Sequence, residues 1–259
     1  MVNLIKMDLR RMLKATILKV SLIIIAIINI FIAGVLPVIL KMIPNIPNFD
    51  TDEICDTISD PFGISLLAIL LFMSAVSFFY ADFSNGFVKN LAGQVPKRSN
   101  LIVSKFVVIG IHNFIFMIVG VLSKLIGVGI AAALGVTFKS SGMIAAAILT
   151  LLIKWMLCMG ICAILLFITS GVRNKTLASI VAVIIGTGAL AFVYMGLTTA
   201  IATLFKVNVN VSEYMPDQLL SSVNVGSNVA VANAIIVAII CSGLFLGLAI
   251  KTFNKRDIK

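Results

Sequence analysis

The sequence predicts an all-α membrane protein, with one transmembrane domain over residues 1–259, six membrane-spanning helices and both ends in the cytoplasm. Composition is the first observation behind this prediction. Hydrophobic residues make up 61% of the chain and charged residues 12%, whereas a soluble domain carries roughly 25% charged residues. The second observation is that the charges gather between long uncharged runs, which is the layout that a bilayer imposes.

The segment before the first span, residues 3–14, is predicted to form an amphipathic elbow helix at the membrane surface. At helical spacing its apolar residues share one face, namely Leu4, Ile5, Leu9, Met12 and Leu13. Its basic residues Lys6, Arg10 and Lys14 lie toward the other face. The alternative is an ordinary charged flank without regular structure.

Six apolar stretches are long enough for a helix to cross the hydrocarbon layer, which takes roughly 17 to 25 residues. They lie near residues 20–40, 64–80, 106–126, 143–169, 177–205 and 229–250. The first stretch also follows basic residues, as a secretory signal does. It is longer than the roughly 7 to 15 residues of a signal core, so a permanent helix is expected.

Orientation follows from the lysine and arginine residues beside the spans, since these gather on the cytoplasmic side of membrane proteins. The basic side holds Lys6, Arg10, Arg11, Lys14, Lys19, Lys89, Lys97, Arg98, Lys105, Arg173, Lys175, Lys251, Lys255, Arg256 and Lys259. The other side holds Lys41, Lys139 and Lys206. Both termini are therefore predicted to be cytoplasmic. The same positions explain the net charge of +10 without a nucleic-acid partner.

Two connections are predicted on the outer side. Residues 41–61 contain three prolines and five acidic residues, which predicts an irregular, solvated connection. Asp50, Asp52 and Asp56 within it could bind a cation loosely, although a solvating face is the simpler interpretation. Residues 206–228 begin with valines that alternate with asparagines, a weak strand-like pattern.

The residues that would drive transport or hydrolysis within this chain are missing from the predicted spans. All acidic residues fall in predicted loops or tails, and the single histidine, His112, is expected to serve packing or hydrogen bonding. No G-x-x-x-x-G-K-[ST] phosphate loop occurs, and no cofactor or metal site is expected. Cys158 and Cys162 are predicted to be packing residues. Any active work therefore takes its energy from another chain.

Two lysines interrupt the apolar runs. Lys124, toward the outer end of the third span, is expected to extend its ammonium group to the headgroups. Lys154 lies nearer the middle of the fourth span and is predicted to face an aqueous path, a partner helix or a bound anionic group. It is the candidate residue of a substrate path. In the last span, Gly243-x-x-x-Gly247 would allow a second copy of the chain or a neighbouring helix to approach closely.

The longest cytoplasmic connection, residues 81–105, carries a characteristic order of residues: Asp82, Gly86, Lys89, Pro96, Lys97, Arg98 and Lys105. This order resembles the transmembrane subunits of type-2 ATP-binding-cassette transporters, particularly small bacterial permeases linked to peptide export or lantibiotic immunity. In that family an acidic residue, a Gly-x-x-Lys step, a Pro-Ser-Arg-like turn and a later lysine follow the second span. The six-span plan, the basic amphipathic start and the tail Phe253-Asn254-Lys255-Arg256-Asp257 are similar as well.

The resemblance implies a bacterial plasma-membrane permease that is not itself an enzyme. It implies a cytoplasmic coupling helix between the second and third spans, ending at Pro96, that sits in a groove of a separate ATPase subunit. That ATPase subunit, and not this chain, would bind ATP. A second permease subunit, identical or different, would complete the transporter. An antimicrobial or other peptide is the favoured exported substrate, with a hydrophobic drug or lipid as the alternative. A membrane scaffold or sensor that moves no solute is the alternative from another class.

Overall fold

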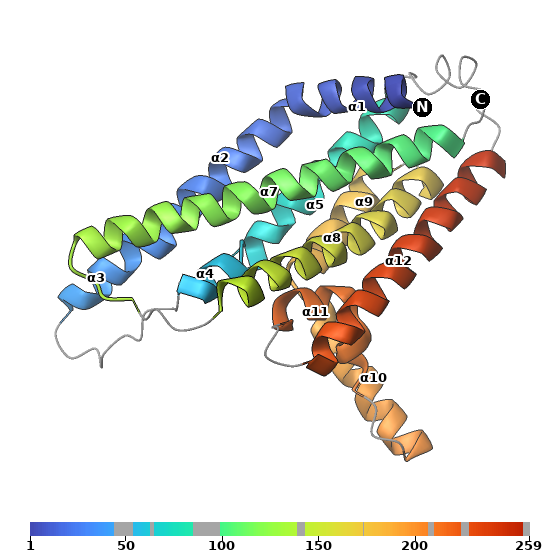
Figure 1. Cartoon of the computed structure of the whole chain (residues 1–259). Coiled ribbons are helices and arrows are strands. Elements are labelled where there is room, and N and C mark those ends of the chain that lie inside the picture. The colour runs from blue at the N-terminus through green and yellow to red at the C-terminus, as the bar shows by residue number, and fades with distance from the viewer. Residues whose placement is uncertain are drawn as a thin grey trace.

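The computed structural model of the chain describes residues 1–43, 54–62, 65–84, 99–138, 143–172, 174–206, 210–223 and 228–255. In these ranges every regular element is a helix, as predicted (Figure 1). The α-helices are α1 (Val2–Lys14), α2 (Thr16–Ile30), α3 (Leu36–Met42), α4 (Ile54–Ser59), α5 (Ser65–Ser84), α7 (Ser99–Ala133), α8 (Ile144–Val172), α9 (Lys175–Gly186), α10 (Leu190–Phe205), α11 (Pro216–Ser222) and α12 (Asn228–Lys255). A π-helical turn, η1 (Phe31–Val35), joins α2 to α3, and a 3-10 turn, η2 (Val211–Tyr214), precedes α11.

Four helical stretches of the described chain are long and apolar enough to cross a membrane, and they are Thr16–Met42, Ser99–Ala133, Ile144–Val172 and Val231–Lys255. Each coincides with one of the predicted spans. Their outward faces carry large apolar side chains, such as Ile27 at 62% exposure and Leu122 at 55%. Exposure of such faces to water is unfavourable, whereas contact with lipid acyl chains is favourable. The chain is therefore a multi-pass membrane protein.

The remaining two predicted spans look different from the prediction. The stretch predicted as one helix over 177–205 is two helices, α9 and α10, which meet at a bend of 70° and count as a fifth span only if the pair is taken together. The break falls where Gly188 adopts a φ of +69°, a left-handed conformation that glycine takes without steric cost. The second span is represented by a shorter apolar helix, Leu67–Ala81 within α5. The number of six crossings remains a prediction.

Helix α1 forms over the segment predicted to be an elbow, and it ends where Ala15 adopts an extended conformation. Met12 and Asp8 are buried on its inner side, while Lys6, Arg10 and Lys14 are exposed. The ordinary charged flank is thereby excluded as a structural alternative. Its location at a membrane surface stays a prediction.

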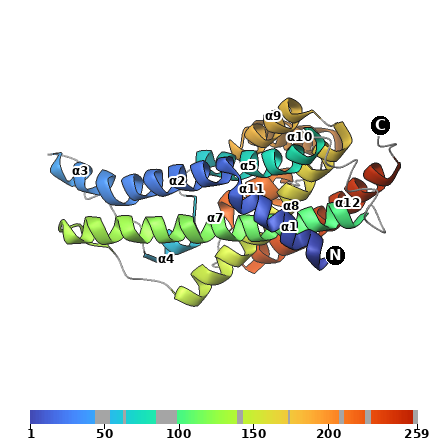
Figure 2. The same ribbon diagram turned by 90° about the horizontal axis from the view of Figure 1, so that it is seen from above.

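Helix α2 continues through η1 into α3, and the whole stretch lies side by side with α7 in both views (Figures 1 and 2). The π-helical turn precedes Pro37, whose ring cannot fit an uninterrupted α-helix, so the wider turn accommodates it. Gly34 of this turn meets Gly127 of α7 so closely that a Cβ on Gly34 would lie 3.1 Å from the Gly127 Cα. The two backbones are thus in direct contact.

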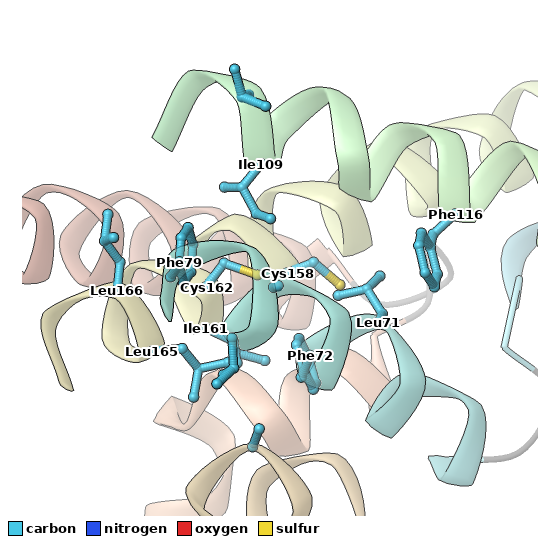
Figure 3. Close-up of a cluster of buried hydrophobic side chains, with 14 of the residues drawn as sticks. Leu71, Phe72, Phe79, Ile109, Phe116, Cys158, Ile161, Cys162, Leu165 and Leu166 are labelled. Carbon is cyan, nitrogen blue, oxygen red and sulfur yellow. The ribbon is translucent and has the colours of Figure 1, made fainter. Parts of the chain in front are cut away.

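Phenylalanine and leucine side chains from α5, α7 and α8 converge on the core of the molecule, as Figure 3 shows. Phe72 and Phe79 of α5, Phe116 of α7 and Leu165 of α8 are fully buried. Cys158 and Cys162 lie among them with no exposure, as the packing prediction expected. Because lipid is as apolar as these side chains, close packing rather than exclusion from water holds these helices together.

The beginnings and ends of the helices divide the molecule into two ends (Figure 1). The start of α1, the start of α7 and the end of α12 lie at one end, which we call the terminal end. The end of α3 and the end of α7 lie at the opposite end, where the Lys41 ammonium donates to the carbonyl of Gly135. The start of α1 and the end of α12 therefore lie at the same end of the molecule, and the location of both termini in the cytoplasm stays a prediction.

Candidate functional site

Two lysines are buried inside the helical bundle, at 7% exposure for Lys124 of α7 and 4% for Lys154 of α8. Both ammonium groups reach one carboxylate, that of Asp60. Lys154 Nζ lies 3.4 Å from Asp60 Oδ1, and Lys124 Nζ lies 3.5 Å from Oδ2. Lys124 Nζ also donates to the main-chain carbonyl of Asp60. We call these three residues the ion-pair cluster.

The ion-pair cluster adds a partner to two expected residues. Lys124, which was expected to extend toward the headgroups, binds Asp60 of the connection between two spans. Lys154 also contacts Asp60, and its role in a substrate path stays a prediction. It lies ten residues beyond Ile144, or about 15 Å along α8. A buried ammonium in a membrane costs roughly 2.5 to 3.5 kcal/mol, so an ion pair is the arrangement that membrane burial demands.

Asp60 belongs to the connection over residues 41–61 that was predicted to be irregular and solvated. We call residues 54–62 the outer segment, and for these residues the prediction is wrong. It begins with helix α4, and its Thr57, Pro61 and Phe62 are buried. Asn29 of α2 donates to the Pro61 carbonyl at 3.2 Å. Asp50 and Asp52, which could bind a cation in the prediction, lie outside the described residues, as does the side chain of Asp56.

Glycine at position 120 of α7 makes room for the outer segment. A Cβ at Gly120 would lie 2.4 Å from the Pro61 carbonyl oxygen, closer than real Cβ atoms come. Asn29 Nδ2 also reaches the Gly120 carbonyl at 3.4 Å. The outer segment is therefore wedged between α2, α7 and α8 by backbone contact on one side and ion pairs on the other.

The electrostatics of Asp60 reflect two opposing effects. Burial acts to raise the pKa of the Asp60 carboxyl, but the ammonium groups of Lys154 and Lys124 outweigh it, so the pKa lies below its ordinary value. Asp60 is thus ionised at neutral pH and both ion pairs are formed. The arrangement offers electrostatic attraction between helices rather than acid–base chemistry.

A cavity of about 320 Å³ lies beside the ion-pair cluster. Its wall is formed by Asp60 and Phe62 of the outer segment, by α5, by the break between α9 and α10, and by α11. Asp217 of α11, also on this wall, accepts a hydrogen bond from Tyr194 of α10 at 3.1 Å. The strand-like pattern predicted for this region is not found at Val211, which begins η2, while residues 207–209 lie outside the described residues.

A second polar group occupies the core between the two ends of the bundle. His112 is 1% exposed and lies 2.6 Å from Ser74 Oγ and 3.1 Å from Asn113 Oδ1. These contacts confirm that His112 is a hydrogen-bonded core residue. Within the described chain no three potential metal ligands come together.

The predicted ATPase-contacting segment precedes the start of α7 in the sequence, and the start of α7 lies at the terminal end. Asp82 falls in the last turn of α5, where only the backbone is described, and Gly86, Lys89, Pro96, Lys97 and Arg98 lie outside the described residues. The coupling helix itself is therefore still a prediction. Lys105, near the start of α7, is 3% exposed, and its ammonium lies 4.7 Å from the centre of the Phe78 ring.

Asp8 provides a contact at this end that the sequence did not suggest. It lies on the buried side of α1, where it accepts a hydrogen bond from Ser104 Oγ of α7 at 2.7 Å and lies 3.9 Å from Arg11. Helix α1 is thereby fixed to the first turns of α7. A helical-face analysis that placed Asp8 beside Leu9 and Met12 would have given the signal for a polar contact within the protein.

The described geometry contains charged contacts that link helices at each end of the bundle, and a continuous helix, α7, between the two ends. A comparison with curated proteins found no match. A comparison with protein families matched residues 12–189 to the family described as "ABC-2 family transporter protein". Because this match covers more than half of the chain, the protein belongs to the ABC-2 transporter family, as one of its membrane-spanning permeases.

Proposed function

We propose that the chain is the permease subunit of an ATP-driven exporter, oriented with both termini in the cytoplasm of a bacterial cell. A separate ATPase subunit binds and hydrolyses ATP and contacts residues 82–105. A second permease subunit completes the path for the substrate. The match to the ABC-2 family over residues 12–189, which include this cytoplasmic connection, is the observation that carries the proposal.

The substrate in this proposal is a hydrophobic or amphipathic molecule, with an antimicrobial or other peptide favoured. The apolar character of the bundle supports this class, as does the mixed wall of the 320 Å³ cavity, where Phe62 and Phe72 face Asp60, Asp217 and Gln218. A hydrophobic drug or lipid would meet the same wall.

Helix α7 supplies the mechanical connection in this mechanism. It runs without interruption from Ser99, directly after the cytoplasmic connection, to Ala133, about 50 Å away. Lys124 lies on its outer part. A displacement of Ser99 by the closing ATPase therefore moves Lys124 relative to Lys154 of α8, and the carboxylate of Asp60 must leave one of the two. The outer segment closes the bundle in one state and is released in the other.

The coupling assignment is tested by purifying the permease with a candidate ATPase subunit and measuring ATP hydrolysis in vesicles. The substitutions Asp82→Ala, Lys89→Ala and Arg98→Ala are each expected to reduce permease-stimulated hydrolysis about tenfold, because each removes a contact that transmits closure. Lys175→Ala, an exposed basic residue at the start of α9, is the matched control and should leave hydrolysis unchanged. Unchanged copurification and hydrolysis in all three variants would refute the assignment.

A further inference from the structure

One face of α1 gathers positive charge around a shallow depression. The depression has a volume of about 410 Å³ and is lined by Asn3, Lys6, Met7, Arg10, Arg11 and Lys14. These positions recur every three or four residues, so they form a single stripe along the helix. We call this stripe the basic face. Like charges at this spacing repel one another, and a bound anion would remove that repulsion.

The opposite side of α1 is fixed to the protein. Met12 and Asp8 are 1% and 2% exposed, and the Ser104 hydroxyl of α7 donates to the Asp8 carboxylate at 2.7 Å. Arg11 joins the two sides, because it lines the depression and its guanidinium lies 3.9 Å from Asp8. An anion held by the basic face therefore acts on the contact between α1 and α7.

Exposed apolar side chains lie beside the basic face at both ends of α1, with Val2 at its start and Leu13 and Ile17 where α1 turns into α2. Val2, Leu13 and Ile17 are exposed at 76%, 44% and 39%. Exposed aliphatic groups beside a cluster of cations match a molecule with acyl chains below an anionic headgroup, whereas a free anion would use the cations alone.

We propose that the basic face binds the phosphate headgroup of an anionic phospholipid, and that this lipid sets how efficiently the start of α7 transmits ATPase movement. Lipid binding is independent of the proposed function, while its effect on coupling rests on it. The phosphate is held by the cations of the basic face, and the acyl chains lie against the exposed aliphatic residues. Through Arg11 and Asp8, the bound lipid fixes α1 against Ser104, five residues after α7 begins.

The binding step is tested with the permease alone, in nanodiscs of phosphatidylcholine to which phosphatidylglycerol is added, by native mass spectrometry. The triple substitution Lys6→Gln, Arg10→Gln, Lys14→Gln is expected to weaken phosphatidylglycerol binding about 100-fold. A triple control, Lys19→Gln, Lys175→Gln, Lys251→Gln, removes the same charge from exposed positions outside the depression and should bind normally. Excess inorganic phosphate should not displace the lipid. Equal binding by both triple variants, or displacement by phosphate, would overturn the site.

The coupling step is tested with the ATPase complex in vesicles with and without phosphatidylglycerol. The wild-type complex should hydrolyse ATP faster with the anionic lipid, and Ser104→Ala should bind the lipid normally yet lose this response. The variant with Lys6→Arg and Lys14→Arg keeps the charge and should behave as wild type, which separates lost charge from misfolding. If the triple Gln variant instead fails to copurify with the ATPase while binding lipid normally, the basic face contacts protein and the proposal is wrong.

Discussion

Replacement of Asp60 by asparagine is expected to lower the free energy of unfolding by about 3 kcal/mol, because it leaves the Lys124 and Lys154 ammonium groups buried without a carboxylate. Asparagine keeps the shape of the side chain, so the change isolates the charge. This loss is at the lower end of the range measured when one partner of a buried ion pair is removed, because the Asp60 side chain is 42% exposed and water screens the charges. Thermal unfolding of the purified permease in detergent measures the loss.

Two companion variants separate the ion pairs from general damage. Asp217→Asn changes another carboxylate on the wall of the same cavity, one that accepts from Tyr194, and should cost less than about 1 kcal/mol. The double variant Asp60→Asn, Lys154→Met should recover part of the loss, because it removes one of the two stranded charges. A double variant as unstable as the sum of its single changes would contradict the ion-pair interpretation.

The same contact predicts a particular pH dependence. The pKa of Asp60 is lower in the folded protein than its ordinary value of about 3.9, because two ammonium groups favour the carboxylate. Its contribution to stability is therefore complete above that ordinary value and is lost as the pH falls through the lowered pKa. The stability difference between wild type and Asp60→Asn should be constant from about pH 5 to 8 and should shrink below about pH 4.

Gly120→Ala is expected to be the most damaging methyl addition in α7. The new Cβ would lie 2.4 Å from the Pro61 carbonyl oxygen, a backbone atom that can move only if the outer segment moves with it. Displacing that segment also stretches the hydrogen bond from Asn29 and the pairs to Asp60. We expect the free energy of unfolding to fall by about 3 kcal/mol, which is at the upper end of the range for overpacked sites, and thermal unfolding measures this loss.

Gly129 supplies the matched control for this substitution. It lies in the same helix, and no described atom comes within 4 Å of the Cβ it lacks. Gly129→Ala should therefore be neutral or stabilising by up to about 1 kcal/mol, since alanine favours the helix. Equal destabilisation by both substitutions would mean that the contact with Pro61 does not determine the effect.

Much of the fold could be predicted because membrane burial imposes long apolar runs, and four of the six predicted spans are continuous helices. The break at Gly188 was not predicted, because residues 177–205 carry no charge and are long enough to span as one helix. The pair Gly186 and Gly188 within this stretch was the local signal for the break. The prediction also missed α4, because proline and acidic residues on both sides dominate the composition of that connection.

The sequence indicated only one side of the ion-pair cluster. Lys154 stood out as a charge in an apolar run, but its partner is 94 residues away in a segment whose carboxylates resemble a solvated loop. A count of charges gives the missing signal, because two lysines inside the spans with no intramembrane acid require a carboxylate from a connection. The ATPase-contacting residues stay predictions, since only the backbone of Asp82 is described.

The backbone contact between Gly34 and Gly127 limits which bodies can rotate during a transport cycle. With no side chain between them, η1 and α7 cannot separate without opening a void, so α7 and the stretch from α2 to α3 are expected to tilt as one unit together with Pro61. Gly160 allows a similar approach of α8 to α12, where a Cβ on Gly160 would lie 3.3 Å from the Cys241 Cβ and 3.5 Å from the Ala238 carbonyl oxygen, and this contact defines a second unit. In the proposed transport cycle, alternating access would then be a rocking of two helix pairs, with Lys154 and Trp155 between them.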